Sequence, residues 1–218
     1  MPLRCVSPPV RWHGLILAGG AARRFGRDKV VARVNGQRLI DLATASLVDA
    51  DGVSVALGTP ERAASLAPLL PSGVTGFADD RPGCGPMGGL ASALARHRDS
   101  WVAALAADLP LVPAAGWSWL AHQHRQGAVA RVPRDARGRW EPLAALYHGS
   151  LVDELRSHVA SGQPARLALH TWLDTLAAKR RVVSADPASM PGSALLNVNR
   201  PEDAARLEGL LQERLGSG

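Results

Sequence analysis

Short apolar runs of strand length alternate with segments of helical periodicity along most of this chain, and this alternation restricts the possible fold more than any other feature. The clearest run, at 101–107, is wholly apolar, as expected of a strand that helices cover on both faces. Similar runs occur at 13–18, 53–57 and 74–78. Strands that alternate with helices favour a mostly parallel sheet, because each crossover returns the chain to the same edge.

Helical spacing of apolar residues, or a proline suited to a first turn, marks the segments between these strands. In the first half we expect a short extension at 30–34 with a turn after it, and helices at 39–47, from Pro60 and at 90–95. In the less regular second half we expect helices at 114–126, 150–160, 165–177 and from Pro201, with short strands at 128–132, 142–147, 181–183 and 194–196. The prediction is an α/β fold of three layers, α/β/α, around a doubly wound, mostly parallel but mixed sheet.

The length of 218 residues and the 46% share of hydrophobic residues suit one globular domain. We expect this domain at 13–218, behind a loose N-terminal tail at 1–12 that has no apolar core of a secretory signal. No apolar run approaches the roughly 20 residues of a membrane-spanning helix, so we expect no membrane partner. Cys5 and Cys84 belong to no CxxC pair, which favours a reducing, cytoplasmic location.

The net charge is +6, from 25 basic and 19 acidic residues, and such a field attracts nucleic acids and nucleotide triphosphates alike. No run of five or more basic residues is present, and only 4% of the residues are aromatic. Binding of single-stranded nucleic acid by stacking needs more aromatic surface than this. We therefore expect no nucleic-acid partner, and keep that function as a distant alternative.

Three polar or glycine-rich features each follow directly on a predicted strand. They are the segments 19–29 and 79–89, and Asp108. In open α/β sheets, ligands bind beyond the carboxyl ends of the strands, near the point where the strand order reverses. The shared placement therefore indicates one ligand site built from all three.

The segment 17–29 reads Leu-Ala-Gly-Gly-Ala-Ala-Arg-Arg-Phe-Gly-Arg-Asp-Lys and is neither a P-loop nor a GxGxxG motif. Gly19 and Gly20 allow backbone N–H groups to approach phosphate oxygens, because no Cβ stands in the way. Asp28 can orient Lys29 or fold the loop locally. The segment also supplies up to four cations that can pair with a triphosphate, from Arg23, Arg24, Arg27 and Lys29. The alternative interpretation is a flexible basic surface loop.

Acidic and amide side chains supply the other candidate ligands. Asp108 ends an apolar strand, where a carboxylate can bind Mg²⁺ together with substrate phosphates or, alternatively, cap the following turn. Of Asp79 and Asp80, the spacing to Gly85 favours Asp79 as the ligand or base contact.

Asn197 and Asn199, two residues apart on a predicted strand, would point to one face and offer amides to a pterin or a phosphate. Turn formation before Pro201 is the alternative. The seven histidines show no metal-binding pattern and are interpreted as surface residues, and four tryptophans as core or interface residues.

These motifs resemble the signatures of molybdenum cofactor guanylyltransferases, which belong to the Rossmann-like nucleotidyltransferases. The resemblance extends from about Gly14 to Leu211 and includes five motifs in the family's order. The motifs are Leu-Ala-Gly-Gly…Arg-Arg-Phe-Gly…Asp-Lys at 17–29, Asp79 with Gly-Pro-Met-Gly-Gly at 85–89, Ala-Asp-Leu-Pro at 107–110, Glu-Pro-Leu-Ala-Ala-Leu-Tyr at 141–147, and Asn-Val-Asn-Arg-Pro-Glu-Asp at 197–203.

The resemblance implies a fold like that of the nucleotide-diphospho-sugar transferases and assigns roles to particular residues. Lys29 would contact the phosphates of GTP, and Asp108 would ligate Mg²⁺, the expected cofactor. The nucleotide would further be bound by Leu17, Ala18, Gly19, Gly20 and Asp79. Departures from the family pattern are Arg200 for Thr, Met87 for Leu, Phe25 for Met, and the absence of an Asn from 56–59. The last departure puts one contact to guanine or ribose in doubt.

The resemblance further implies transfer of GMP from GTP to the phosphate of molybdopterin, with release of pyrophosphate. Lys29, Asp108 and Arg24 would be the catalytic residues, and Asn197 and Asn199 would bind the acceptor. Acceptor molybdoenzymes or their chaperones would be the protein partners. The alternatives are a molybdopterin cytidylyltransferase, another nucleotidyltransferase acting on a small phosphate, and a non-catalytic carrier of the molybdenum cofactor.

Overall fold

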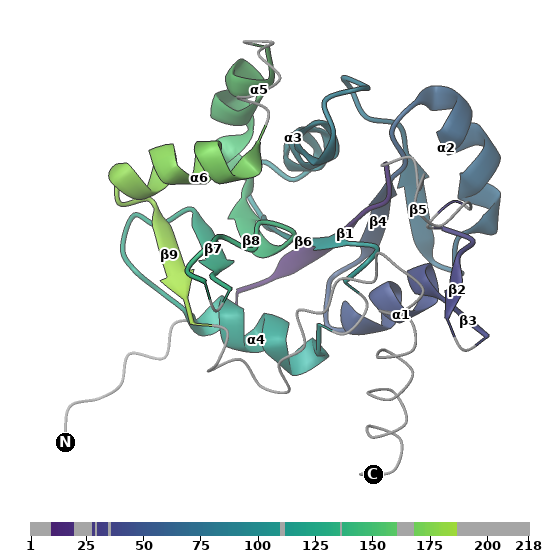
Figure 1. Ribbon diagram of the computed structural model, residues 1–218, viewed down its shortest axis with the longest axis horizontal. Coiled ribbons are helices and arrows are strands. Elements are labelled where there is room, and N and C mark those ends of the chain that lie inside the picture. Colours follow the sequence, from purple (N-terminus) through teal and green to yellow (C-terminus); the bar gives the residue numbers. More distant parts are fainter. Residues whose placement is uncertain are drawn as a thin grey trace.

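A seven-stranded sheet in the order β5-β4-β1-β6-β8-β7-β9 forms the centre of the molecule (Figure 1). The computed structural model describes residues 10–19, 28, 30–34, 36–109, 112–135, 137–160 and 168–186. The strands of the sheet are β1 (Trp12–Leu17), β4 (Val53–Ala56), β5 (Val74–Phe77), β6 (Trp101–Ala106), β7 (Ala130–Pro133), β8 (Ala144–His148) and β9 (Val182–Ala185).

The sheet is mixed, with its parallel part in the first half of the chain. β5, β4, β1 and β6 are all parallel, whereas β8 is antiparallel to both of its neighbours and β9 is parallel to β7. From β1 the chain moves outward to β4 and β5, and then returns to place β6 on the other side of β1. The strand order therefore reverses between β1 and β6, which is where a ligand site is expected in such sheets.

Helices cover both faces of this sheet, as the sequence predicted. Figure 1 shows α3, α5 and α6 on one side and α1 and α4 on the other. The helices are α1 (Leu39–Ser46), α2 (Pro60–Leu66), α3 (Pro86–Arg96), α4 (Ala114–His122), α5 (Val152–Ala160) and α6 (Leu169–Ala178), with short 3₁₀ helices η1 (Ala67–Leu69) and η2 (Gly149–Leu151).

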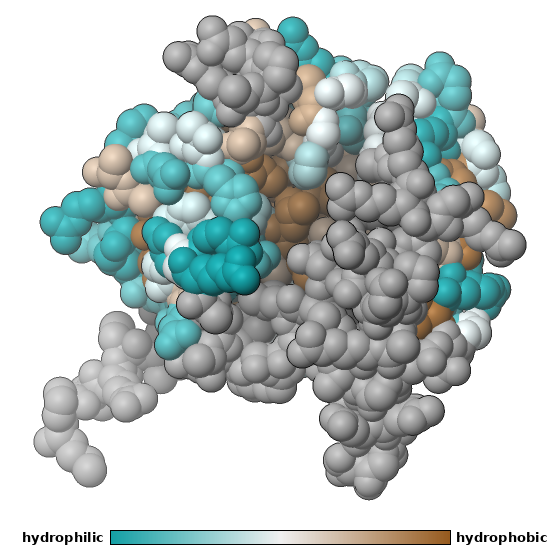
Figure 2. All heavy atoms as spheres, viewed as in Figure 1, coloured by the Kyte–Doolittle hydropathy of each residue, from teal (hydrophilic) through white to brown (hydrophobic). Residues whose placement is uncertain are grey.

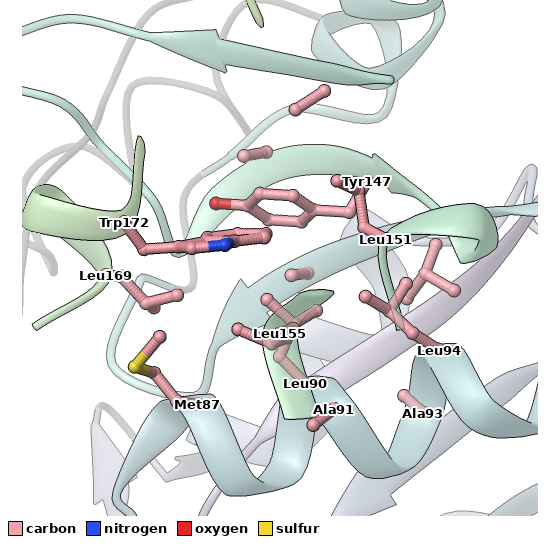
Figure 3. Close-up of a cluster of buried hydrophobic side chains, with 14 of the residues drawn as sticks. Met87, Leu90, Ala91, Ala93, Leu94, Tyr147, Leu151, Leu155, Leu169 and Trp172 are labelled. Carbon is pink, nitrogen blue, oxygen red and sulfur yellow. The ribbon is translucent and has the colours of Figure 1, made fainter. Parts of the chain in front are cut away.

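One hydrophobic core lies between the sheet and the α3, α5 and α6 layer (Figure 3). Met87, Leu90 and Leu94 of α3 recur at helical spacing and are fully buried. Across from them the rings of Tyr147 and Trp172 lie 5.8 Å apart between centroids. Burial of one such side chain contributes roughly 1.5–3 kcal/mol. The three α3 residues therefore hold this helix, and with it the N-terminal turn, firmly against the sheet.

A second core lies on the opposite face, and α1, α2 and α4 contribute to it. Trp117 of α4 is buried there and donates from Nε1 to the Oγ of Ser46 in α1 at 3.0 Å, so its one polar group is satisfied. On the face shown in Figure 2, a group of hydrophobic residues is visible near the middle, and hydrophilic residues cover much of the left side.

The predicted elements agree with the structure in type and differ in some bounds. α4 ends at His122 rather than at 126, because the next residues are polar and Gly127 turns the chain at a φ of +78°. The expected turn after 30–34 is a hairpin of β2 (Arg33–Val34) and β3 (Gln37–Arg38). Residues 1–9 of the predicted tail at 1–12, the strand at 194–196 and the helix from Pro201 lie outside the described residues, and β1 begins within that tail, at Trp12. Over the ranges that the structure describes, no helix has the length and hydrophobicity to cross a membrane.

Candidate active site

Four parallel strands bring three segments of the sequence to one edge of the sheet. Backbone hydrogen bonds continue the strand pairing just beyond the strand ends, and so fix these segments to one another. The bonds run from Ala18 N to Ala56 O at 3.1 Å, from Asp79 N to Gly58 O at 2.7 Å, and from Ala107 N to Leu17 O at 3.2 Å. The residues that follow β5, β4, β1 and β6 are therefore held in the same order as the strands.

A pocket of about 140 Å³ lies at this edge, and Asp79 and Asp108 both line it. The two carboxylates follow the outer strands of the parallel group, β5 and β6, which are separated by three strand spacings, or roughly 14 Å. Both side chains nevertheless reach the same pocket, so one ligand can contact both. The complete lining is Leu17, Gly19, Ala56, Asp79, Gly85, Pro86, Gly89, Ala106, Asp108 and Leu143.

Glycines allow the close backbone approaches on which the pocket depends. A Cβ at Gly89, in the first turns of α3, would lie 2.7 Å from Cδ2 of Leu17 and 2.8 Å from Cβ of Ala56. The helix can therefore lie directly on the ends of β1 and β4 only with glycine here. Gly19 and Gly58 are also in close contact, since a Cβ at Gly19 would lie 3.4 Å from the backbone of Gly58.

The N-terminus of α3 opens onto the same pocket. Gly85 precedes the helix with a φ of +59°, a conformation that favours glycine, and Pro86 occupies the first helical turn. Both residues line the pocket. The first N–H groups of a helix have no partner within the helix and carry its positive dipole end, so this side of the pocket favours an anionic or electron-rich ligand.

Asp79 is buried in the pocket wall with one oxygen unsatisfied. Its side chain is 8% exposed, and Oδ1 has no hydrogen-bond partner among the described residues. Burial raises the pKa of Asp79 to about 6, with a smaller contribution from neighbouring Asp80, while the hydrogen bond with the Gly58 backbone and the charge of Arg96 oppose the shift. An unpaired acceptor in a pocket indicates a donor on the ligand.

Asp108 follows the buried strand β6 and is likewise 8% exposed. Among the residues that the structure describes, no three His, Cys, Asp or Glu side chains are grouped to hold a metal ion by themselves. A single carboxylate that lines a pocket can contribute to a Mg²⁺ site, because Mg²⁺ is commonly held by one or two carboxylates, substrate phosphates and water. The donor set therefore fits a magnesium ion that arrives with a triphosphate.

Comparison with known proteins identifies the family. Residues 14–179, well over half of the chain, match the family model described as the MobA-like NTP transferase domain. The chain belongs to the MobA-like NTP transferase family. It is a nucleotidyltransferase.

Several relatives of this nucleotidyltransferase carry the name probable molybdenum cofactor guanylyltransferase. The one from Deinococcus radiodurans is 34% identical over 205 residues, which cover 92% of this chain and 95% of the relative. The one from Chloroflexus aggregans is 33% identical over 207 residues, covering 91% of this chain and 94% of the relative. The similarity thus extends over nearly the full length of both proteins.

Solved structures support the fold. The crystal structure of molybdopterin-guanine dinucleotide biosynthesis protein A from Archaeoglobus fulgidus is similar with a TM-score of 0.74 and 24% identity, covering 92% of this chain and 99% of that one. A nucleotidyl transferase from Methanothermobacter is similar with a TM-score of 0.69 and 18% identity, covering 93% of this chain and 99% of that one. At these identities the likeness concerns the fold of the nucleotidyltransferase alone.

The structure brings together four of the residues that the sequence singled out for the nucleotide. Leu17, Gly19, Asp79 and Asp108 line one pocket, while Ala18 is fully buried beside them. The other predicted site residues lie outside the described part of the chain, and their roles stay predictions. These residues are Gly20, Arg23, Arg24, Arg27, Lys29, Asn197 and Asn199.

Two features of the site were missed by sequence reasoning. Leu143 reaches the pocket from the turn before β8, although it stood in the sequence only as part of a family motif. Arg62 of α2 contacts the chain at the end of β1, and no spacing or motif in the sequence indicates this. Its contacts depend on how α2 packs, which a local pattern does not contain.

Proposed function

We propose that this nucleotidyltransferase transfers GMP from GTP to the phosphate of molybdopterin, forming molybdopterin guanine dinucleotide and pyrophosphate. The observation that carries the proposal is the joint placement of Asp79 and Asp108 in one pocket with Leu17 and Gly19. Full-length similarity to relatives named probable molybdenum cofactor guanylyltransferase supports the choice of nucleotide and acceptor.

The proposed reaction is an in-line displacement at the α-phosphorus of GTP. An oxygen of the molybdopterin phosphate forms the new P–O bond, the bond between the α-phosphorus and the bridging oxygen to the β-phosphorus breaks, and pyrophosphate leaves with the electron pair. No covalent enzyme intermediate is needed, so the protein mainly positions the two substrates and stabilises negative charge as it moves toward pyrophosphate.

Several described residues at the pocket have a place in this scheme. Asp79, with its free acceptor oxygen, would accept hydrogen bonds from donors of the guanosine. The backbone at Leu17, Ala18 and Gly19 would hold the nucleotide across the strand ends. Asp108 would hold Mg²⁺, which would supply a Lewis acid that neutralises phosphate charge.

The remaining roles belong to residues outside the described part of the chain. Lys29 and Arg24 would stabilise the developing charge on pyrophosphate, and Gly20 would present a backbone N–H group to phosphate. Asn197 and Asn199 would bind the acceptor. We further propose a cytoplasmic location, and acceptor molybdoenzymes or their chaperones as the proteins that receive the product.

Incubation of the purified chain with GTP, MgCl₂ and molybdopterin tests the proposed function. We expect pyrophosphate and molybdopterin guanine dinucleotide in equal amounts, measured by a coupled pyrophosphate assay and by mass spectrometry. Omission of molybdopterin or addition of EDTA should abolish both products. Absence of pyrophosphate release, together with tight binding of the molybdenum cofactor, would instead support the non-catalytic carrier.

Competition between nucleotides tests the base specificity. With GTP and CTP at equal concentration and limiting enzyme, we expect the guanine dinucleotide as the main product. A dominant cytosine dinucleotide would identify the chain as a cytidylyltransferase, and the choice of GTP would then be wrong while the type of reaction would stand.

A further inference from the structure

Arg62, in the first turn of α2, joins the ends of two strands and a distant carboxylate through one side chain. Its Nε donates to the carbonyl oxygen of Leu57 at 2.9 Å, and its Nη2 donates to that of Ala18 at 3.0 Å. Its Nη1 forms an ion pair with Oδ2 of Asp28. The side chains of Arg62 and Asp28 are only 28% and 18% exposed, so water competes weakly with these contacts.

The start of α2 positions this side chain. Gly58 turns the chain after β4 with a φ of +85°, and Thr59 caps the helix by accepting from the backbone N of Arg62 at 3.3 Å. Three acceptors that point in different directions require a planar group with several donors. A guanidinium provides five N–H groups in a fixed fork, whereas a lysine ammonium cannot match all three acceptors at once.

Asp28 is itself a fixed point of the chain. Its Oδ1 accepts from the backbone N of Val30 at 3.1 Å, and its backbone oxygen accepts from the N–H groups of Val31 at 3.0 Å and Ala32 at 2.8 Å. Arg62 therefore connects two anchored points. Ala18 lies directly before the paired glycines of the basic segment 19–29, and Asp28 directly precedes the lysine that ends it.

We propose that Arg62 is a positioning residue for the triphosphate. It holds both ends of the basic segment, through Ala18 at the start and Asp28 at the end. It also neutralises the Asp28 carboxylate, which without this counter-charge would repel the phosphates. The inference takes its nucleotide from the proposed function, but it requires only that the chain binds a nucleoside triphosphate.

Removal of the guanidinium should weaken triphosphate binding in particular. In Arg62→Met two carbonyl oxygens lose their donor and the Asp28 carboxylate loses its counter-charge. We expect the KM for GTP to rise about tenfold, the loss that corresponds to one charge-assisted hydrogen bond. GMP has no β- or γ-phosphate for the basic segment to bind, so its Kd should change much less than that of GTP.

The test measures kcat and KM for GTP by pyrophosphate release, and the Kd of GTP and of GMP by calorimetry. The chains compared are wild type, Arg62→Met, Arg62→Lys, Asp28→Asn and the double variant. Arg62→Lys should be intermediate, because it keeps the charge and loses the fork. The double variant should bind GTP more tightly than Arg62→Met alone, because the unpaired carboxylate is gone while the Asn oxygen can still accept from Val30 N.

The matched control is Arg98→Met. Arg98 makes a two-pronged pair with Asp153, with both hydrogen bonds at 3.1 Å, before the start of β6 and therefore at the opposite edge of the sheet. This variant should keep the wild-type KM and the wild-type ratio of the two affinities. A purely structural role for Arg62 would lower the melting temperature but leave the KM and this ratio unchanged in the folded fraction.

Three results would overturn the inference. They are an unchanged KM for GTP in Arg62→Met, an equal loss of GTP and GMP affinity, and a double variant weaker than the single one. If Arg62→Met does not fold, Asp28→Asn provides the test instead. We then expect a lower ratio of GTP affinity to GMP affinity than in the wild type, and an unchanged ratio would contradict the inference. A wild type that binds GTP without producing the dinucleotide refutes only the proposed function, whereas one that binds no triphosphate refutes both.

Discussion

Burial of the Asp79 carboxylate costs free energy, and hydrogen-bond donors of a bound nucleotide would reduce this cost. Its pKa of about 6 means that ionisation at neutral pH works against burial, and Oδ1 has no partner among the described residues. We therefore expect Asp79→Asn to raise the melting temperature of the free protein at pH 7 and to weaken GTP binding at least tenfold, the cost of losing hydrogen bonds to a charged acceptor.

Two measurements check the prediction for Asp79. Thermal unfolding without ligand gives the change in stability, and calorimetry with GTP gives the change in affinity. The affinity of the wild type should also fall as the pH drops from 7 to 5, since protonation removes the carboxylate that accepts hydrogen bonds. An Asn variant that binds GTP as the wild type does would exclude Asp79 from the nucleotide contacts.

Asp108 is the residue on which the metal would depend. Asp108→Ala should lower kcat by about 100-fold or more, as removal of a charge stabiliser does, and Lys29→Ala should do the same. Thermal unfolding of each variant separates a loss of activity from a loss of folding. The assay is pyrophosphate release at saturating GTP and MgCl₂. Asp153→Asn, on the exposed surface, is the control that should keep full activity.

At the scale of elements, the contact of α3 with the ends of β1 and β4 decides the shape of the pocket. Alanine normally stabilises a helix relative to glycine by about 1 kcal/mol. At Gly89 the added Cβ would lie under 3 Å from Leu17 and Ala56, and the firmly packed helix cannot move away easily. We expect Gly89→Ala to destabilise the protein by about 1–3 kcal/mol and to raise the KM for GTP.

Urea unfolding and steady-state kinetics measure the two effects of Gly89→Ala. The higher helix propensity of alanine would by itself stabilise the variant. Even a small net destabilisation would therefore show that the steric conflict with Leu17 and Ala56 outweighs this gain. A variant that is more stable than the wild type and binds GTP normally would mean that α3 does not define the pocket.

The elements differ in how far the sequence alone could predict them. β1 and β6 were predictable because an apolar run between turn residues reports burial directly. The end of α4 was predicted four residues too late. The polar residues after His122 are compatible with a helix, and the sequence alone does not show that none of them packs against the core. The strand that contains His13 was predicted, but this histidine was interpreted as a surface residue, whereas it is half-buried and its ring stacks on that of His97.

The candidate site, too, could be predicted from the sequence only in part. That the segments after β1, β5 and β6 meet at one edge follows from parallel strands, so the meeting of Asp79 and Asp108 could be anticipated. The contacts of Arg62 could not, because Arg62 and Asp28 are 34 positions apart in the sequence and meet only through the tertiary packing of the chain. The roles of Lys29, Asn197 and Asn199 stay predictions, because these residues lie outside the described part of the chain.

In the whole molecule, titratable groups with shifted pKa values lie at both edges of the sheet. At the edge away from the pocket, burial lowers the pKa of His13 to about 4, helped by His97 and opposed by Asp51. The rings of His13 and His97 are stacked with centroids 4.0 Å apart, and burial lowers the pKa values of His97 and His148 as well. Each of these histidines therefore loses its proton at a lower pH in the folded protein than in the unfolded chain.

The two edges therefore have opposite effects on acid stability. Between pH 4 and 6.5 the unfolded chain binds more protons at His13 than the folded protein does, so this residue makes stability rise with pH. Between about pH 4 and 6 the folded protein binds more protons at Asp79, so that residue makes stability fall with pH. One full proton of difference corresponds to about 1.4 kcal/mol per pH unit.

Separate removal of each group should therefore change the slope of stability with pH in opposite directions. His13→Gln, which keeps a donor for the Oγ of Ser54, should flatten the rise of unfolding free energy between pH 4 and 6.5, and Asp79→Asn should steepen it. Urea unfolding at half-unit pH intervals gives both slopes, with exposed His124→Gln as the control that should leave the slope unchanged. Because the slope is independent of any constant loss of stability, a parallel curve for His13→Gln would show that this buried histidine does not contribute to the acid sensitivity of the fold.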